Sequence, residues 1–145
     1  IDFSETLENL VQFFEDQNSN ISIISDIQKN VVFLGLPDRV ARVFINLIEN
    51  AVSFAGENGE VRVTLKKSWR HGIMITIEDS GSGVPEASRA DIFERFFSSR
   101  EGLAVRENSS GLGLYICKQV VEAHEGAIEV LDSDALGGAM FRVHF

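Results

Sequence analysis

Two asparagines stand four residues apart in a segment that otherwise favours a helix. Asn46 and Asn50 therefore share one helical face, and Ser53 extends that face by three more residues. Asparagine is a poor residue for a helix interior unless its amide has a partner. One interpretation is a solvated polar face. The other is a ligand-facing stripe, since an asparagine carbonyl oxygen is a suitable ligand for Mg²⁺.

An aspartate followed by glycines ends an apolar strand. Asp79 follows the alternating residues Ile73–Ile77, and Gly81 and Gly83 come two and four residues after it. One interpretation is a simple turn. The other is a binding site, because glycines let the backbone approach a ligand and the carboxylate can accept a hydrogen bond from an amino group such as adenine N6. Guanine presents an acceptor there, and buried acceptors left unpaired are penalised.

A third glycine-rich segment enters a helix. It comprises Ser109, Ser110, Gly111, Leu112, Gly113 and Leu114. Main-chain amides at a helix N-terminus attract phosphate, although many helices begin with serine and glycine. The segment is not a dinucleotide fingerprint, which has a third glycine and a preceding strand, and it is not a Walker loop, which needs Gly-Lys-Ser/Thr.

The elements that position these segments follow from hydrophobic periodicity. Helices are predicted over Ser4–Gln17, from Pro37 to Phe54, over Ala90–Phe97 and over Gly111–His124; strands are predicted at Ile21–Ile23, Val31–Phe33, Val61–Leu65, Ile73–Ile77, Ile128–Val130 and Phe141–Phe145. Ser4 is the expected N-cap of the first helix. Residues 98–110 are polar and poorly periodic, which predicts a mobile loop. This order predicts one α/β two-layer sandwich, with a mixed sheet of about five strands and helices on one face.

The composition bounds the class of protein. The 145 residues suit one domain, and no apolar run approaches the ~18 residues typical of a membrane span. The net charge of −9 disfavours nucleic acid as a partner, whereas the charge of a nucleotide can be handled by Mg²⁺ and main-chain amides. Cys117 is the single cysteine, so we expect a reducing cytoplasm. Because the chain starts at Ile1, we expect a piece of a longer protein.

Four motifs occur in an order that is typical of one family. They are Asn46–Ala51, Asp79–Gly83, Ile92–Phe97 and Gly111–Leu114. In these motifs the chain resembles, over nearly its whole length, the catalytic domain of sensor histidine kinases. That family belongs to a superfamily with gyrase, the MutL repair proteins and heat-shock chaperone ATPases. The segments Asn50–Phe54 and Arg106–Leu114 are also similar to the ChvG/ExoS envelope sensors of alpha-proteobacteria.

The resemblance implies a role for each candidate residue. Asn50 would bind a Mg²⁺ that bridges the phosphates of ATP, Asn46 would act one turn away, and Asp79 would hold adenine N6. The other nucleotide-binding positions would be Ser53, Phe54, Gly81, Gly83, Val84, Phe97, Arg100, Ser110, Gly111, Leu112, Gly113 and Leu114. Residues 98–110 would form a lid. The implied cofactors are ATP and Mg²⁺.

Three positions depart from the family pattern. Ser53 stands where the family often has a Lys or Arg that reaches a phosphate. Ser98 stands where an Arg often follows the aromatic pair, and Arg100 could compensate two residues later. Ser109 replaces the first glycine of the usual Gly-x-Gly-Leu-Gly-Leu. These departures concern ATP affinity and catalytic rate rather than the fold.

The resemblance implies transfer of the ATP γ-phosphoryl group to a histidine on a separate dimerisation domain, expected upstream of Ile1, and then to a response regulator. His71, His124 and His144 lack the sequence setting of a phosphoacceptor histidine. We expect a cytoplasmic domain of an inner-membrane sensor, which meets the membrane only through other parts of the protein. Two alternatives stay open: a nucleotide-gated interaction module with weak or no kinase activity, and an anti-sigma-type serine kinase.

Overall fold

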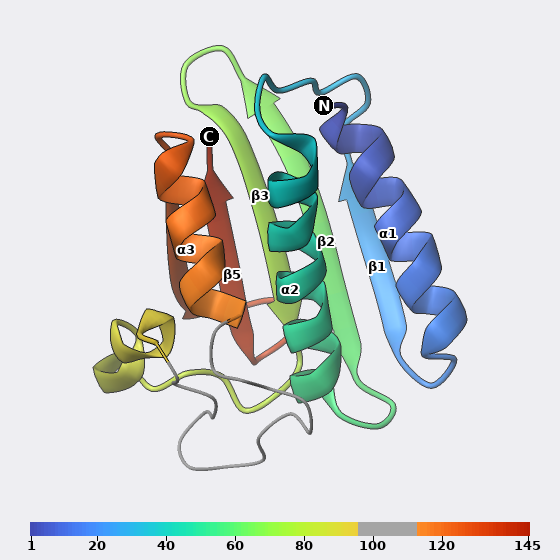
Figure 1. Cartoon of the computed structure of the whole chain (residues 1–145). Helices are drawn as coiled ribbons and strands as arrows, with labels where there is room; N and C mark the ends of the chain where they lie inside the picture. Colours follow the sequence, from blue (N-terminus) through green and yellow to red (C-terminus); the bar gives the residue numbers. More distant parts are fainter. Residues whose placement is uncertain (96–112) are drawn as a thin grey trace.

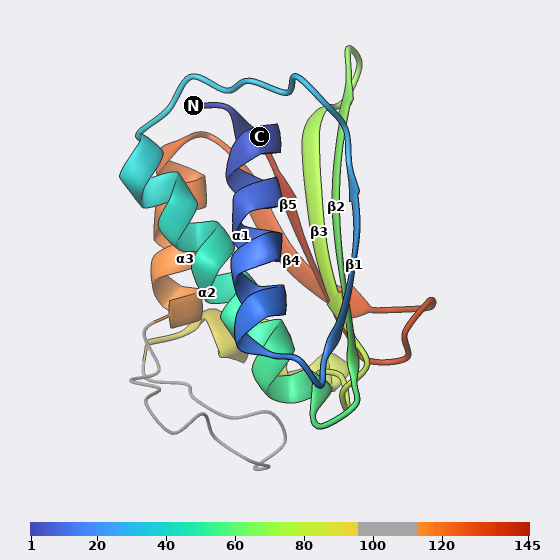
Figure 2. The same ribbon diagram turned by 90° about the vertical axis from the view of Figure 1, so that its right-hand side faces the viewer.

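The structure is a computed structural model that describes residues 1–95 and 113–145. Within these residues, five strands form one mixed sheet, and three α-helices lie side by side on one face of it (Figures 1 and 2). The predicted two-layer α/β sandwich is therefore confirmed. Both ends of the chain lie at the same end of the molecule (Figure 1).

The elements follow one another in an order close to the predicted one. They are α1 (Phe3–Gln17), β1 (Ser22–Ile27), α2 (Pro37–Ala55), β2 (Glu60–Ser68), β3 (Gly72–Asp79), the 3-10 helices η1 (Glu86–Ser88) and η2 (Asp91–Phe93), α3 (Gly113–Ala123), β4 (Ala127–Asp132) and β5 (Ala139–His144). The strand order is β1-β2-β3-β5-β4. Strands β1 and β2 are parallel, and the other neighbouring pairs are antiparallel.

Strand β3 lies at the centre of the sheet and directs alternate side chains into the core. Ile75 pairs with Leu65 of β2 and Val143 of β5, and all three side chains are fully buried. Because side chains alternate between the two faces of a strand, Asp79 falls on the same, helix-covered face as Ile75 and Ile77. The last residue of an apolar strand therefore carries its carboxylate into the layer between sheet and helices.

Helix α2 lies between α1 and α3 across the sheet (Figure 1). Pro37 occupies its first turn, where the missing N–H has no intrahelical acceptor to lose. Apolar side chains at helical spacing pack it against the sheet: Val40, Val43, Phe44, Leu47, Ile48 and Ala51. The same spacing carries Asn50 to the buried side, where it is 7% exposed.

The predicted N-cap of the first helix is wrong. Asp2 caps α1, and its Oδ1 accepts the Glu5 N–H at 3.0 Å. Ser4 lies inside the helix, where its hydroxyl donates to the Gln28 carbonyl at 2.6 Å and accepts the Val31 N–H at 2.9 Å. Through these long-range bonds Ser4 holds the connection between β1 and α2. A capping rule considers only neighbouring residues and so does not predict such bonds.

The strand predicted at Val31–Phe33 is also wrong. Val32 forms an isolated bridge with Asp2. The Phe33 N–H donates to the Ile1 carbonyl, and the Ile1 ammonium donates to the Phe33 carbonyl, both at 2.9 Å. The Phe33 ring stacks on Phe3 at 5.1 Å between centroids. This segment therefore covers the start of α1 instead of joining the sheet.

The helix predicted over Ala90–Phe97 differs from the structure in its described part. That part contains η2, and η1 precedes it. Phe93 is 7% exposed and packs edge-on against Phe141 at 6.2 Å, as a core residue does. Residues 96–112, and with them the whole predicted loop and the start of the last predicted helix, lie outside the described residues.

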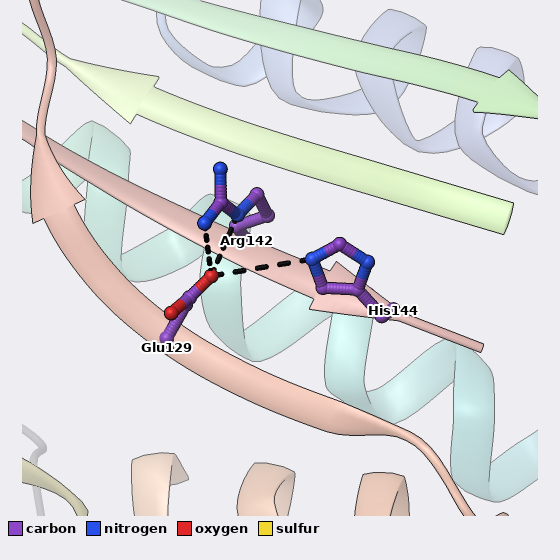
Figure 3. A network of polar contacts seen from close by, with 3 residues as sticks. All are labelled: Glu129, Arg142 and His144. Atoms are coloured by element: carbon purple, nitrogen blue, oxygen red, sulfur yellow. Dashed lines mark hydrogen bonds and ion pairs between the residues drawn. The ribbon is translucent and has the colours of Figure 1, made fainter. Parts of the chain in front are cut away.

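Polar and charged side chains occupy the sheet face opposite the helices. Arg142 of β5 lies across from Glu129 of β4, and its Nε donates to Glu129 Oε1 at 2.7 Å (Figure 3). The His144 ring nitrogen lies 4.0 Å from the same oxygen. Such exposed pairs contribute about 0–1 kcal/mol to stability. No helix in the described ranges has the length and apolar character needed to cross a membrane.

Candidate functional site

Helix α2 and strand β3 end, and the described part of α3 begins, at one end of the molecule, beside the turn between β4 and β5 (Figure 1). The predicted residues of α2 are Asn46, Asn50, Ser53 and Phe54, those after β3 are Gly81, Gly83 and Val84, and those opening α3 are Gly113 and Leu114. The fold thus gathers segments that are up to about half the chain apart.

Asp79 is fully buried at the end of β3 and is held by main-chain donors. Its Oδ1 accepts the Gly81 N–H at 2.9 Å and the Ala139 N–H at 3.3 Å. A buried carboxylate is tolerated when it is hydrogen-bonded in this way. These main-chain bonds fix the orientation of the carboxylate group.

Gly81 brings the loop after β3 against the last turn of α2. A Cβ on Gly81 would lie 2.3 Å from the Phe54 carbonyl oxygen, so a side chain at this position would push the two segments apart. Ser80 fixes the loop from the other side, because its N–H donates to the Glu60 carbonyl at 3.1 Å and its hydroxyl accepts the Glu60 N–H at 2.9 Å. The structure therefore joins two predicted residues, Phe54 and Gly81.

Gly83 and Val84 continue the loop into the core. Gly83 has a φ of +80°, in the left-handed region that glycine adopts without strain. Val84 is 4% exposed. The predicted glycines thus have two different roles, since Gly81 permits a close approach and Gly83 permits a turn.

The β4–β5 turn contributes two residues that sequence reasoning missed. A Cβ on Gly138 would lie 2.4 Å from Asp79 Oδ1 and 2.6 Å from the Gly81 nitrogen. Ala139 supplies the second N–H to the carboxylate. Two adjacent glycines between strands indicate a hairpin turn, yet of Gly137 and Gly138 only Gly137 has a positive φ, at +87°. The second glycine was the available signal of a close approach.

Asn50 is a buried polar side chain at the C-terminal half of α2. Its Nδ2 makes no hydrogen bond among the described residues. An unpaired buried donor costs about 1–3 kcal/mol, so such a group calls for a reason. Asn46, one turn earlier, is half-buried, and Ser53, three residues later, is exposed. The three side chains therefore do not form one evenly solvated stripe.

Several predicted contacts fall outside the part of the chain that the structure describes. They are Phe97, Arg100, Ser110, Gly111 and Leu112. Gly113 and Leu114 are described, and both are partly buried at the start of α3. In the described ranges, no group of three or more His, Cys, Asp or Glu side chains gathers as a metal cluster would.

A hollow of about 640 Å³ lies at the other end of α2 and α3. Its lining is largely apolar and includes Leu34, Gly35, Leu36, Arg39, Gln119, Val120, Ala123 and His124. None of the predicted site residues is among them. We place the site at the end with Asp79 because the buried carboxylate, the glycine contacts and the unpaired amide are all there.

The site's residues suit a flat group with an amino N–H and a polar, charged tail. Glycines keep side chains away from a fixed carboxylate, which accepts hydrogen bonds but cannot donate them when ionised. The buried Asn50 amide, one turn before Phe54, offers a carbonyl oxygen and an N–H to a second polar group. These features match a purine ring and a metal-bound phosphate chain.

Comparison with known proteins also indicates an ATP-binding family. The model of the family described as histidine kinase-, DNA gyrase B- and HSP90-like ATPase matches residues 35–145. The chain is 34% identical over 127 residues to the sensor histidine kinase TmoS of Ectopseudomonas mendocina, covering 88% of this chain and 13% of TmoS. It is 31% identical over 143 residues to the sensor protein kinase WalK of Staphylococcus aureus, covering 97% of this chain and 24% of WalK.

Solved structures agree over the whole chain. The mycobacterial sensor histidine kinase MprB matches with a TM-score of 0.82 and 30% identity, over 99% of this chain and 93% of that one. The ATP-binding domain of PrrB from Mycobacterium tuberculosis matches with a TM-score of 0.80 and 28% identity, over 100% and 93% of the two chains. The resemblance to sensor histidine kinases is confirmed, whereas the narrower one to ChvG/ExoS sensors stays a prediction.

Proposed function

We propose that Mg·ATP binds where α2 and β3 end. The proposal starts from the family, because this chain belongs to the histidine kinase-, DNA gyrase B- and HSP90-like ATPases. The chain corresponds to the ATP-binding catalytic domain of sensor histidine kinases. It spans 13% of the length of TmoS and 24% of that of WalK, so the activity of a whole sensor is part of the proposal.

The observation that carries the proposal is the environment of Asp79. Main-chain N–H groups of Gly81 and Ala139 orient the carboxylate, and glycines keep side chains away from it. A carboxylate held in this way would accept the adenine N6 hydrogen bond. Guanine would place a carbonyl oxygen against it, and two facing acceptors desolvated together lose binding energy.

The unpaired Asn50 amide supports a place for the phosphates and Mg²⁺. The Asn50 carbonyl oxygen would ligate the metal, and Nδ2 would find an acceptor in a phosphate oxygen or a metal-bound water. Asn46 would contribute from the preceding turn. When bound, Mg²⁺ supplies positive charge to the phosphates, and the part of this chain is to position the nucleotide.

The remaining contacts are proposed from the family pattern. Phe54 and Val84 would lie beside the base or ribose, while Gly113 and Leu114 would approach the phosphates from the start of α3. Phe97, Arg100, Ser110, Gly111 and Leu112, in or beside a lid at residues 98–110, would complete the site.

We assign no nucleophile to this chain. The γ-phosphoryl group would pass to a histidine on a dimerisation domain of the same protein and then to a response regulator. The domain would work in the cytoplasm and reach the inner membrane only through other parts of the protein. Nucleic acid is not a proposed partner, because the chain has a net charge of −9.

Calorimetric titration of Mg·ATP and Mg·GTP into this chain tests the proposal. We expect ATP to bind at micromolar to millimolar concentration and GTP at least tenfold more weakly. A separately produced domain with the acceptor histidine should then become labelled from γ-³²P-ATP. Equal affinity for the two nucleotides, or efficient labelling of His71, His124 or His144 in this chain alone, would contradict the proposal.

Ser53 favours a second candidate function. It is exposed on α2, at the position where the family often places a basic residue. This position therefore brings no positive charge to the phosphates. A nucleotide-gated interaction module would bind ATP and leave the separate histidine domain unlabelled. An anti-sigma-type serine kinase would give acid-stable phosphoserine on a protein partner, whereas phosphohistidine is labile in acid.

A further inference from the structure

We propose that the turn between β4 and β5 positions the Asp79 carboxylate, and that Gly138 is the residue through which it sets the preference for adenine. The inference rests on the proposed function, in which Asp79 accepts the adenine N6 hydrogen bond. It adds a positioning residue from a hairpin that is remote in sequence from every residue assigned above to the nucleotide.

The contact of Gly138 with the Asp79 loop leaves no space for a side chain. A Cβ there would lie 2.3 Å from the Asp79 carbonyl oxygen, 2.4 Å from its Oδ1 and 2.6 Å from the Gly81 nitrogen. Two of these three atoms are main-chain atoms that cannot rotate away. A methyl group at Gly138 must therefore displace the carboxylate, the loop that holds it, or both.

The turn also holds the carboxylate by a hydrogen bond. The Ala139 N–H donates to Asp79 Oδ1 at 3.3 Å, so the turn contributes a main-chain donor that orients the group. Its own shape is fixed by two short bonds, because the Ser133 N–H donates to the Gly138 carbonyl at 2.7 Å and the Gly137 N–H donates to the Ser133 carbonyl at 2.8 Å.

A buried polar pair ties the same turn to β3 beside Asp79. Ser133 is 2% exposed and its hydroxyl donates to Glu78 Oε1 at 2.9 Å, while accepting the Leu136 N–H at 3.0 Å. Glu78 and Asp79 are neighbours in β3, so their side chains point to opposite faces of the sheet. The turn thus contacts the end of β3 through both faces, and its position fixes where the Asp79 carboxylate lies.

The consequence is a specific role in recognising the base. If Gly138 only stabilised the fold, a substitution would lower the affinity for all nucleotides equally. If it positions the acceptor, the substitution removes the advantage of a ligand that carries the 6-amino group. The matched ligand is purine riboside diphosphate, which lacks only that group.

The test measures the affinities of Mg·ADP and Mg·purine riboside diphosphate for the wild-type chain and three variants. The wild type should prefer ADP by about 10- to 100-fold, the range for a hydrogen bond to a charged group. Gly138→Ala should reduce this preference to below about threefold. Ser133→Ala, which loosens the turn without entering the site, should reduce it by an intermediate factor of about three to ten.

Gly137→Ala is the control variant from the same turn. Gly137 has a φ of +87°, and a Cβ added there would meet no neighbouring atom within 4 Å, so the substitution strains the backbone without touching Asp79. It should lower the melting temperature and keep the preference for ADP. The comparison separates a damaged hairpin from a displaced carboxylate.

The outcomes separate this inference from the function on which it rests. A wild type that does not distinguish the two ligands contradicts the role of Asp79 itself. A wild type that distinguishes them, with an unchanged preference in Gly138→Ala or an equal loss in Gly137→Ala, overturns the role of Gly138 alone. If Gly138→Ala does not fold, Ser133→Ala decides, and an unchanged preference there overturns the inference.

Discussion

Polar side chains are bonded differently at the two ends of α2. At the N-terminal end, the His124 ring is bonded through both nitrogens, since Nε2 accepts the Leu36 N–H at 3.1 Å and Nδ1 lies 2.8 Å from the Val120 carbonyl. At the C-terminal end, Asn50 keeps a buried Nδ2 without a partner in the described ranges, and Asp79 ends an apolar strand.

The packing around the two ends of α2 also differs, with aromatic rings at one end and glycines at the other. At the N-terminal end, Phe3 packs against Phe33, Phe44 and Phe145 at 5.1–5.4 Å between ring centroids. At the C-terminal end, glycines occupy the closest contacts. Aromatic packing holds one end together, whereas the other end keeps buried polar groups that a ligand can use, as functional sites often do.

The largest expected effect is on stability at the N-terminal end. Phe3→Ala should lower the free energy of unfolding by about 3–5 kcal/mol, because Phe3 is fully buried. The affinity of the folded protein for Mg·ADP should not change. Denaturant unfolding measures the first quantity and calorimetry the second. Phe13→Ala is the control, since Phe13 is 55% exposed and its loss should cost about 0.5 kcal/mol or less.

Next in size is the effect of Asp79→Asn on binding. The amide keeps a carbonyl oxygen for the Gly81 and Ala139 N–H groups but loses the charged acceptor, so Mg·ADP affinity should fall by about 1.5–3 kcal/mol, roughly 10- to 100-fold. Asp26→Asn, at an exposed pair with Lys66, is the matched control and should bind normally. Equal losses in the two variants would show that the effect is one of overall charge.

A smaller effect is expected from His124→Ala. Loss of the bonds to Leu36 and Val120 should lower the free energy of unfolding by about 1–2 kcal/mol, with Mg·ADP affinity unchanged. His71→Ala is the control, because His71 is exposed in the turn between β2 and β3 and should have little effect. A fall in nucleotide affinity with His124→Ala would break the separation of the two ends.

The smallest expected effect on stability, and the one of opposite sign, comes from Asn50→Ala. Removing an unpaired buried amide from a helix should leave the free energy of unfolding unchanged or raise it by up to about 1 kcal/mol, while the Mg²⁺ dependence of ADP affinity disappears. Asn18→Ala is the contrast, because Asn18 Nδ2 donates to the Phe14 carbonyl at 2.9 Å. That variant should be less stable, with unchanged Mg²⁺ dependence.

Local patterns predicted the elements that carry the site. The alternation of Ile73, Ile75 and Ile77 predicted β3 and put Asp79 at its end. Helical spacing after Pro37 predicted α2, but it left open whether Asn50 faces solvent or a ligand. These predictions succeeded because each depends on one element and one period.

The errors and omissions involve contacts between distant segments. Ser4 had the composition of a cap, but its hydroxyl bonds Gln28 and Val31. Gly138 had the composition of a turn, but it is needed for the approach to Asp79, about sixty residues earlier. Neither partner is visible from the neighbouring sequence, so only the folded arrangement shows these roles.

The most direct test of the proposed site is a titration of the ¹⁵N-labelled chain with Mg·ADP, followed by NMR. We predict that the amide signals of Gly81, Gly83 and Ala139 shift with a common affinity, while those of Leu36 and His124 stay in place. Shifts concentrated at Leu36 and His124, with Gly81 and Ala139 unmoved, would place the nucleotide in the hollow at the other end of α2 and contradict a site at Asp79.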